Sequence, residues 1–317
     1  IASKAHTPEI GTVIDDAMRA IEKENKRLKD ILPKNFARPE LDKRRLGDVV
    51  DLFTNIKMVD AGSSRDILGR TYEYCLSKFA EQEGKLAGEF YTPSCVVRTL
   101  VEVLQPYNGR VYDPCCGSGG MFVQSAKFIE NHSGNLRNIS VFGQDSNPTT
   151  WKLAQMNLAI RGIPCDLGEK AANTFTNDLH KDLRADFIMA NPPFNQKDWR
   201  EENELTQDSR WDGYVVPPTS NANYGWILHM VSKLSQNGVA GFLLANGALS
   251  DDGTELKIRQ QLIENNLVEA IIILPRNLFY TTDISVTLWI LNKNKKARVV
   301  EQNGQLKRYR NREKEIL

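Results

Sequence analysis

The spacing of hydrophobic residues changes near residue 88 and divides the chain into two parts. In the first part, apolar positions recur at helical spacing among lysines and arginines, beginning with Ile10, Ile14, Ala17, Ile21 and Leu28. Such spacing places apolar side chains along one face of a helix. Further helical patterns cover residues 41–56 and 67–79, with a break at Gly62-Ser63-Ser64. The pattern predicts a helical N-terminal lobe over residues 1–87, either packed on the next domain or facing DNA through its basic residues.

From residue 88 onward, short apolar runs alternate with helical patterns. One strand is expected to end near Asp113. Six further strands are expected over residues 139–144, 173–175, 185–189, 238–245, 268–274 and 284–291. Helices are expected over residues 94–104, after Met121, and over 148–162, 225–234 and 256–263. This alternation implies right-handed crossovers and a mainly parallel sheet. We therefore predict an α/β domain over residues 88–317 with a mixed, mainly parallel seven-stranded sheet.

The apolar run 185–189 is followed by Ala190-Asn191-Pro192-Pro193-Phe194. Two prolines cannot donate backbone hydrogen bonds, so the strand must end there in an open, extended turn. An amide, a fixed carbonyl and an aromatic ring are then presented at the carboxyl end of a strand, where ligands bind in open α/β sheets. The group suits capture of a planar ring with an exocyclic amine. The Asn191 oxygen and the Pro192 carbonyl can each accept an N–H, while Phe194 stacks on the ring.

A glycine-rich turn at residues 113–120 connects a short strand to a helix. Gly117 and Gly119 allow the backbone to approach a ligand closely, and the helix N-terminus favours a carboxylate. A tight strand–helix connection without a ligand is the alternative. Asp145 follows the next strand, where a nucleotide site of the βαβ type holds ribose hydroxyls, although alone it could be a surface turn residue.

Four other segments are also considered from the pattern. Asp178 follows the least clear strand and could accept a hydrogen bond from a cofactor's adenine amine, but the pattern favours an ordinary loop carboxylate. Thr92-Pro93 predicts the capped start of a helix. The polar segment 195–224 is long enough to be a functional loop, which either closes over a substrate or is simply mobile. The return at residues 275–279 is expected to bring Phe279 near the same sheet edge.

Composition limits the classes of function. The net charge is +1, with 41% hydrophobic and 26% charged residues, so DNA contact must come from local patches or a partner. The five cysteines and four histidines lack metal-ligand spacing, which leaves a zinc site without support and favours reduced thiols in the cytoplasm. No signal peptide or membrane-spanning run is present in the sequence. The chain lacks a starting Met and ends in a charged stretch, so a fragment of a longer protein is expected.

Two motifs together identify a family resemblance. Asp113-Pro-Cys-Cys-Gly-Ser-Gly-Gly and Asn191-Pro-Pro-Phe resemble the amino-methyltransferases that modify adenine in DNA. The order of parts is similar to that of the modification subunit of type I restriction-modification systems, including Gly88-Glu-Phe-Tyr-Thr-Pro before the glycine turn. The resemblance is strongest from Gly88 to Leu291. The opening lobe is shorter than in that family, little follows the last strand, and no target-recognition domain is visible.

The resemblance implies a Rossmann-like methyltransferase fold and transfer of a methyl group from S-adenosylmethionine to the N6 amine of adenine. It implies that the methionine part meets Thr92, Asp113 and the Gly117 and Gly119 turn, with the ribose on Asp145. The catalytic residues would be Asn191, Pro192 and Phe194, with no metal. The implied partners are DNA, a specificity subunit and a restriction subunit, with no membrane.

Other readings of the motifs stay open at this point. Asn-Pro-Pro also serves methyltransferases that act on protein glutamine amides or on RNA bases, and the chain could be a non-catalytic structural subunit. The DNA recognition sequence, the subunit stoichiometry and any preference for hemimethylated DNA are not encoded in these motifs.

Overall fold

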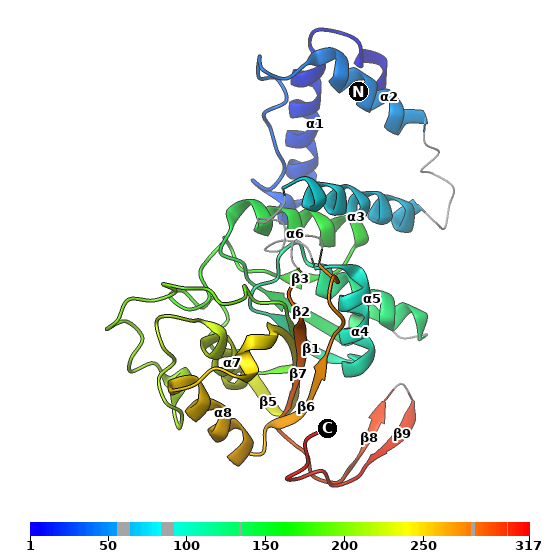
Figure 1. Cartoon of the computed structure of the whole chain (residues 1–317). Coiled ribbons are helices and arrows are strands. Elements are labelled where there is room, and N and C mark those ends of the chain that lie inside the picture. The colour runs from blue at the N-terminus through cyan, green and yellow to red at the C-terminus, as the bar shows by residue number, and fades with distance from the viewer. Residues whose placement is uncertain (56–63, 84–91, 133–134, 280–282, 303) are drawn as a thin grey trace. The chain divides into compact units, whose positions relative to one another are not determined.

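A computed structural model of the chain describes residues 1–55, 64–83, 92–132, 135–279, 283–302 and 304–317. The chain forms two compact units, one of residues 1–75 with 155–162 and the other of residues 76–154 with 163–317 (Figure 1). The domain boundary predicted between residues 87 and 88 lies outside the described residues and stays a prediction, as does the predicted break at Gly62-Ser63. Within the described residues, no helix is both long and apolar enough to cross a membrane.

The first unit is built from helices. They are η1 (Ala2–Lys4), α1 (Ile10–Glu24), η2 (Lys26–Leu28), α2 (Lys43–Asn55), the start of α3 (Ser64–Glu83) and the end of α6 (Pro148–Arg161). The buried Asp15 of α1 accepts hydrogen bonds from the backbone N–H groups of Phe36 (2.9 Å) and Ala37 (3.2 Å). The Asp15 carboxylate thus ties the segment that follows η2 to helix α1. The described part of residues 1–87 contains no strand, as the helical periodicity predicted.

The second unit contains the predicted seven-stranded sheet, in the order β3-β2-β1-β4-β5-β7-β6. All neighbouring strands are parallel except β7, which runs antiparallel to β5 and β6. The strands are β1 (Gly109–Asp113), β2 (Ile139–Gly143), β3 (Cys165–Asp166), β4 (Ala185–Ala190), β5 (Leu234–Ala245), β6 (Val268–Ile273) and β7 (Val286–Asn292). The mixed, mainly parallel architecture is therefore confirmed.

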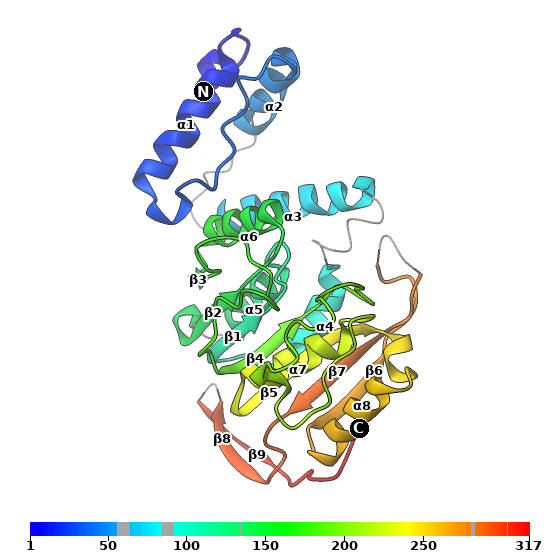
Figure 2. The same ribbon diagram turned by 90° about the vertical axis from the view of Figure 1, so that its left-hand side faces the viewer.

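Helices cover both faces of this sheet. α4 (Ser94–Leu104) and α5 (Gly120–Asn131) lie on one face, and α7 (Asn223–Lys233) and α8 (Thr254–Glu264) lie on the other (Figures 1 and 2). The shorter elements are η4 (Leu136–Asn138), η5 (Ser209–Trp211) and η6 (Asn246–Leu249). A two-stranded hairpin of β8 (Arg298–Gln302) and β9 (Gln305–Tyr309) follows β7. The apolar pattern had not predicted this hairpin, because its residues are largely polar or exposed.

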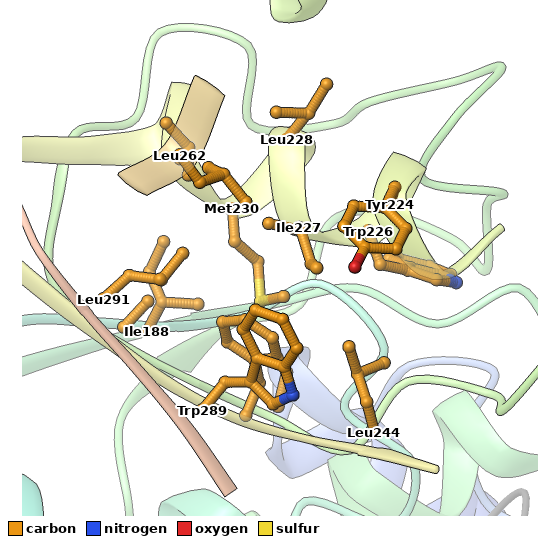
Figure 3. Packing of buried hydrophobic residues seen from close by; sticks show 14 of the residues in the cluster. Ile188, Tyr224, Trp226, Ile227, Leu228, Met230, Leu244, Leu262, Trp289 and Leu291 are labelled. Carbon is orange, nitrogen blue, oxygen red and sulfur yellow. The ribbon is translucent and has the colours of Figure 1, made fainter. Parts of the chain in front are cut away.

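The main hydrophobic core lies between the sheet and α7. Met230 of α7 points toward Trp289 of β7, and Ile188 of β4 and Leu291 of β7 pack beside them (Figure 3). Both Trp289 and Met230 are fully buried. Burying an aromatic or Met side chain stabilises a fold by about 1.5–3 kcal/mol, so this layer holds the central strands in place and gives the carboxyl edge a rigid base.

The strand expected at residues 173–175 is wrong. The third strand of the sheet is β3 at Cys165–Asp166. Residues 173–175 form a turn instead, because the Asn173 side-chain oxygen accepts the N–H groups of Phe175 (2.8 Å) and Thr176 (3.4 Å). A short polar side chain that bonds to the following backbone competes with strand formation.

Candidate active site

The predicted site residues converge because three adjacent strands run in the same direction. In the register of the sheet, Asp113 at the end of β1 lies opposite Gly143 of β2, and Tyr112 lies opposite Ile188 of β4. The chain leaves β1 toward β2 on one side and later returns as β4 on the other side. This reversal is the position where open α/β sheets bind ligands. Asp113, Asp145 and Asn191 therefore emerge at one edge.

Asn191 follows the last residue of β4. The nitrogen of its side-chain amide has a hydrogen-bond partner, whereas the oxygen has none among the described residues. Its Nδ2 donates a hydrogen bond to Thr92 Oγ1 at 3.0 Å. Its Oδ1 is buried and has no hydrogen-bond partner among the described residues. An unpaired buried carbonyl costs about 1–3 kcal/mol, so this oxygen marks a place for an external donor.

Thr92 does not cap the following helix as the sequence predicted. The helix α4 begins at Ser94 with Pro93 as its N-cap, and no side chain caps it. The Thr92 hydroxyl is bonded to Asn191 instead, which makes Thr92 a neighbour of the amide. The predicted contact of Thr92 with a cofactor stays a prediction.

Phe194 lies at the mouth of the same edge, half-buried. Its ring meets Phe279 edge-on, with 6.0 Å between the ring centroids and an interplanar angle of 81°. The return between β6 and β7 thus brings Phe279 beside the motif, as predicted. Pro192, between Asn191 and Phe194, is buried. The Phe194 ring is therefore in contact with a second aromatic ring.

The glycine turn adopts a backbone that favours glycine. Gly117 has φ 54° and Gly119 has φ 80°, a left-handed region that other residues rarely occupy. Gly119 is the N-cap of α5, which has no side-chain cap and no acidic residue in its first turn. The first N–H groups of a helix without such a cap favour an anionic group. The amino end of α5 is thus suited to a carboxylate.

Two acidic side chains flank this turn. Burial raises the pKa of Asp113 to about 7, the nearby charge of Asp145 adds to the rise, and a hydrogen bond from the Cys115 N–H opposes it. Asp145 accepts hydrogen bonds from the Gly117 N–H (3.0 Å) and the Asn147 N–H (2.9 Å). Asp145 therefore ties the glycine turn to the segment that leads into α6.

Asp178 lies on the loop after β3 and is already engaged. Its carboxylate forms an ion pair with Lys233 of α7 at 2.5 Å and accepts the His180 N–H at 2.9 Å. Burial acts to raise the pKa of Asp178, but the hydrogen bond and charge of Lys233 outweigh it and lower that pKa. Its predicted contact with an adenine amine stays a prediction.

Two residues that sequence reasoning missed hold this loop. Lys233 donates to the carbonyls of His180 (2.7 Å) and Lys181 (3.1 Å). Gln144, fully buried after β2, donates to the Ala172 carbonyl (3.1 Å) and the Asn177 carbonyl (2.8 Å). Their partners lie at least 28 residues away along the chain, so no local pattern could have indicated them.

The long segment 195–224 is fastened by buried side chains. Trp199 and Trp211 are 4% and 3% exposed. Arg200 donates to the carbonyls of Glu201, Glu202, Glu204 and Pro217. Arg210 donates to the carbonyls of Thr174 (3.0 Å) and Phe175 (2.6 Å). The segment is therefore packed onto the unit and borders the loop at residues 172–183; its closure over a substrate stays a prediction.

Comparison with known proteins gives consistent results. The profile of the N-6 DNA Methylase family matches residues 63–316. A type I restriction enzyme HindI methylase subunit from Haemophilus influenzae is 46% identical, over 91% of this chain and 67% of that protein. The MjaIX methylase subunit from Methanocaldococcus jannaschii is 40% identical, over 91% of this chain and 52% of that protein.

A solved structure shares the fold. The methyltransferase subunit of a type I restriction-modification system from Streptococcus thermophilus superimposes with a TM-score of 0.81 and 26% identity, covering 94% of this chain and 66% of that one. The chain thus spans between about half and two thirds of the length of these three relatives.

Proposed function

Because this chain belongs to the N-6 DNA methylase family, we propose that it transfers a methyl group from S-adenosylmethionine to the N6 amine of adenine in DNA. It acts as the modification subunit of a type I restriction-modification complex. The Haemophilus and Methanocaldococcus relatives are methylase subunits of type I restriction enzymes, which favours DNA over a protein glutamine or an RNA base. They also favour an enzyme over a non-catalytic structural subunit.

The observation that carries the proposal is the unpartnered Oδ1 of Asn191. This oxygen is an acceptor in need of a donor, and the N6 amine of adenine supplies one. The neighbouring Pro192 carbonyl accepts the second N–H, and neither proline at this turn brings a competing backbone donor. Thr92 holds the other end of the amide, which keeps the oxygen directed toward the substrate.

The residues around the glycine turn fit S-adenosylmethionine. The uncapped amino end of α5 suits its carboxylate, and Asp113 suits its cationic amino group. Asp145 suits the ribose hydroxyls. Asp178 is already paired with Lys233 and the His180 N–H, so an adenine amine would have to share its carboxylate with them. When bound, S-adenosylmethionine supplies a methyl group that is activated by the positive charge on its sulfur.

Catalysis then rests on preorganisation by the chain's own residues. The target adenine must leave the DNA stack to reach the site, and Phe194 stacks on the exposed ring. The lone pair of the amine is delocalised into the ring, so the amine is a weak nucleophile. Acceptors at Asn191 and Pro192 favour a more tetrahedral nitrogen, because they stabilise the charge that develops on its N–H groups.

Three partners follow from the proposal: DNA, a specificity subunit and a restriction subunit. In the proposed complex, the specificity subunit selects the DNA site. A cytoplasmic location, where thiols stay reduced, fits the five free cysteines.

The test is methyl transfer from radiolabelled S-adenosylmethionine to unmethylated genomic DNA, with and without the co-expressed specificity subunit. We expect label in DNA only with the specificity subunit present, and hydrolysis of that DNA to release N6-methyladenine. Label in protein or RNA, or on cytosine, would overturn the proposed function.

A further inference from the structure

The chain reverses direction immediately after Phe194, and a pair of asparagines holds the reversal. Asn195 adopts a left-handed backbone with φ 52°. Its backbone N–H donates to Asn223 Oδ1 at 3.0 Å, and its side-chain Oδ1 accepts from Asn223 Nδ2 at 2.9 Å. A backbone N–H can only donate, so the orientation of the Asn223 amide is fixed by this contact.

Asn223 is the first residue of α7 and is fully buried. Its side chain does not cap its own helix. A buried amide among apolar neighbours is unfavourable unless its donor and acceptor are both used, and Asn195 uses both. A third bond, from the Ala222 N–H to the Gln196 carbonyl at 2.9 Å, ties the same two segments together. We call these residues, 195–196 and 222–223, the asparagine clamp.

The clamp holds the left-handed backbone conformation of Asn195, the residue that follows Phe194. Left-handed backbone is unfavourable for residues with a Cβ, although asparagine tolerates it better than most. A conformation of this kind persists where surrounding bonds hold it. Because Asn195 is bonded directly to Phe194, releasing the turn changes the direction in which the Phe194 ring leaves the backbone, and hence its contact with Phe279.

We propose, on the basis of the proposed function, that Asn223 is a positioning residue that sets the orientation of Phe194 for capture of the flipped adenine. Asn223 does not touch the reacting atoms. It acts through the backbone of Asn195, and α7, which is anchored in the hydrophobic core by Met230, provides the fixed support (Figure 3).

The experiment uses the complex of this chain with its specificity subunit. Methylated positions in genomic DNA treated with the wild-type complex define the target, and duplexes carrying 2-aminopurine at that position then report base flipping by fluorescence. The variants are Asn223→Ala, Asn195→Gly, Asn195→Ala and Phe194→Ala, with Asn223→Ala also combined with Phe194→Ala. The matched control is Asn237→Ala, which removes a side-chain amide contact with Asn294 (2.6 Å) near the amino end of β5.

We expect Asn223→Ala to weaken capture of the flipped base by no more than Phe194→Ala does, which is between about 5-fold and 150-fold for the loss of one stacked ring. The 2-aminopurine signal should fall, while the Kd for S-adenosylhomocysteine stays within about twofold. Asn195→Gly should keep most activity, because glycine occupies the left-handed turn without strain, whereas Asn195→Ala should lose about tenfold. Asn223→Ala should add almost nothing in the Phe194→Ala background, since both changes remove the same contact.

Two results would overturn the proposed role of Asn223. The first is activity of Asn223→Ala equal to that of the Asn237→Ala control. The second is a double variant, Asn223→Ala with Phe194→Ala, whose loss equals the product of the two single losses. Should Asn223→Ala fail to fold, the order of the two Asn195 variants decides, and equal activities of glycine and alanine there would reject the inference. Absence of any DNA methylation by the wild-type complex would instead reject the proposed function, on which the clamp depends.

Discussion

Polar side chains are buried both at the carboxyl edge of the sheet and in the polar network that holds the loop at residues 172–183. The two regions differ in whether these buried groups have hydrogen-bond partners. In the network, Lys233 has three oxygen partners, and His229 lies between the Tyr112 hydroxyl (3.1 Å) and Arg210 (3.3 Å). At the edge, the Asn191 oxygen has no partner and the pKa of Asp113 is raised to about 7 by burial. The comparison indicates that the polar groups of the network are paired with one another and hold the loops, whereas at the edge the Asn191 oxygen is left without a partner among the described residues.

The largest effect is expected on folding stability, when a buried side chain of the polar network is replaced. Lys233→Met removes one partner of the buried ion pair with Asp178, whose side chains are 3% and 10% exposed. Removing one member of a buried pair typically costs about 3–5 kcal/mol. Chemical denaturation should show that loss in the free energy of unfolding. The exposed Lys293 provides the control, since Lys293→Met should cost about 1 kcal/mol or less. Equal costs for the two variants would mean that the network is not structural.

At the carboxyl edge of the sheet, we expect a large loss of activity without a loss of stability. Asn191→Ala should lower kcat by about 100- to 1,000-fold, equivalent to about 2.7–4 kcal/mol of transition-state stabilisation. Its free energy of unfolding should be unchanged or higher, because an unpaired buried carbonyl is removed. Binding of S-adenosylhomocysteine, followed by calorimetry, should persist. Near-normal turnover by this variant would remove the catalytic role assigned to Asn191.

Phe194→Ala should have a smaller effect, on capture of the base. Stacking of a base on an aromatic ring contributes about 1–3 kcal/mol, so the affinity for target DNA should weaken by that amount. A duplex with 2-aminopurine at the target position measures it, with Phe53→Ala in α2 of the first unit as a surface control. A fluorescence change equal to that of the wild-type complex would show that Phe194 does not hold the flipped base.

The smallest effect concerns pH. With a pKa of about 7, Asp113 is mostly protonated at pH 6 and mostly ionised at pH 8. In the proposed cofactor site, only the ionised form would attract the cationic amino group. The affinity for sinefungin should therefore rise by about tenfold from pH 6 to pH 8, or about 1.4 kcal/mol. 5′-Methylthioadenosine lacks that amino group and should show no such dependence. A rise of the same size with Asp113→Asn would exclude this carboxyl as the cause.

Sequence patterns predicted the parts of the fold that depend on local spacing. The apolar periodicity of residues 94–104 matches α4, and the proline pair after Ala190 marks the end of β4. Phe279 was expected at the site edge because β6 and β7 form a hairpin-like return. The motif residues were expected at one edge because parallel strands share their carboxyl ends.

The remainder depends on contacts between distant residues. The Asn173 turn replaced an expected strand, since side-chain bonds to the backbone decided a short, ambiguous segment. Asn223 lies 28 residues from its partner Asn195, and Lys233 lies 53 residues from His180. Each reads in the sequence as an ordinary polar residue of a helix. Only the folded chain shows which polar atoms are paired and which, like the Asn191 oxygen, are not.

At the turn Asn191-Pro192-Pro193, the Asn191 Nδ2 is held by Thr92, the Asn191 Oδ1 is left as an acceptor, and neither proline has an N–H. Under the proposed function, this arrangement has a consequence for damaged DNA. Deamination converts adenine to hypoxanthine, which carries a carbonyl oxygen where the amine was. That oxygen would face the Asn191 carbonyl lone pair to lone pair, with no proline N–H to relieve the repulsion. We therefore expect the proposed site to reject a deaminated base even when that base is flipped and stacked, and this base also lacks the amine that would accept the methyl group.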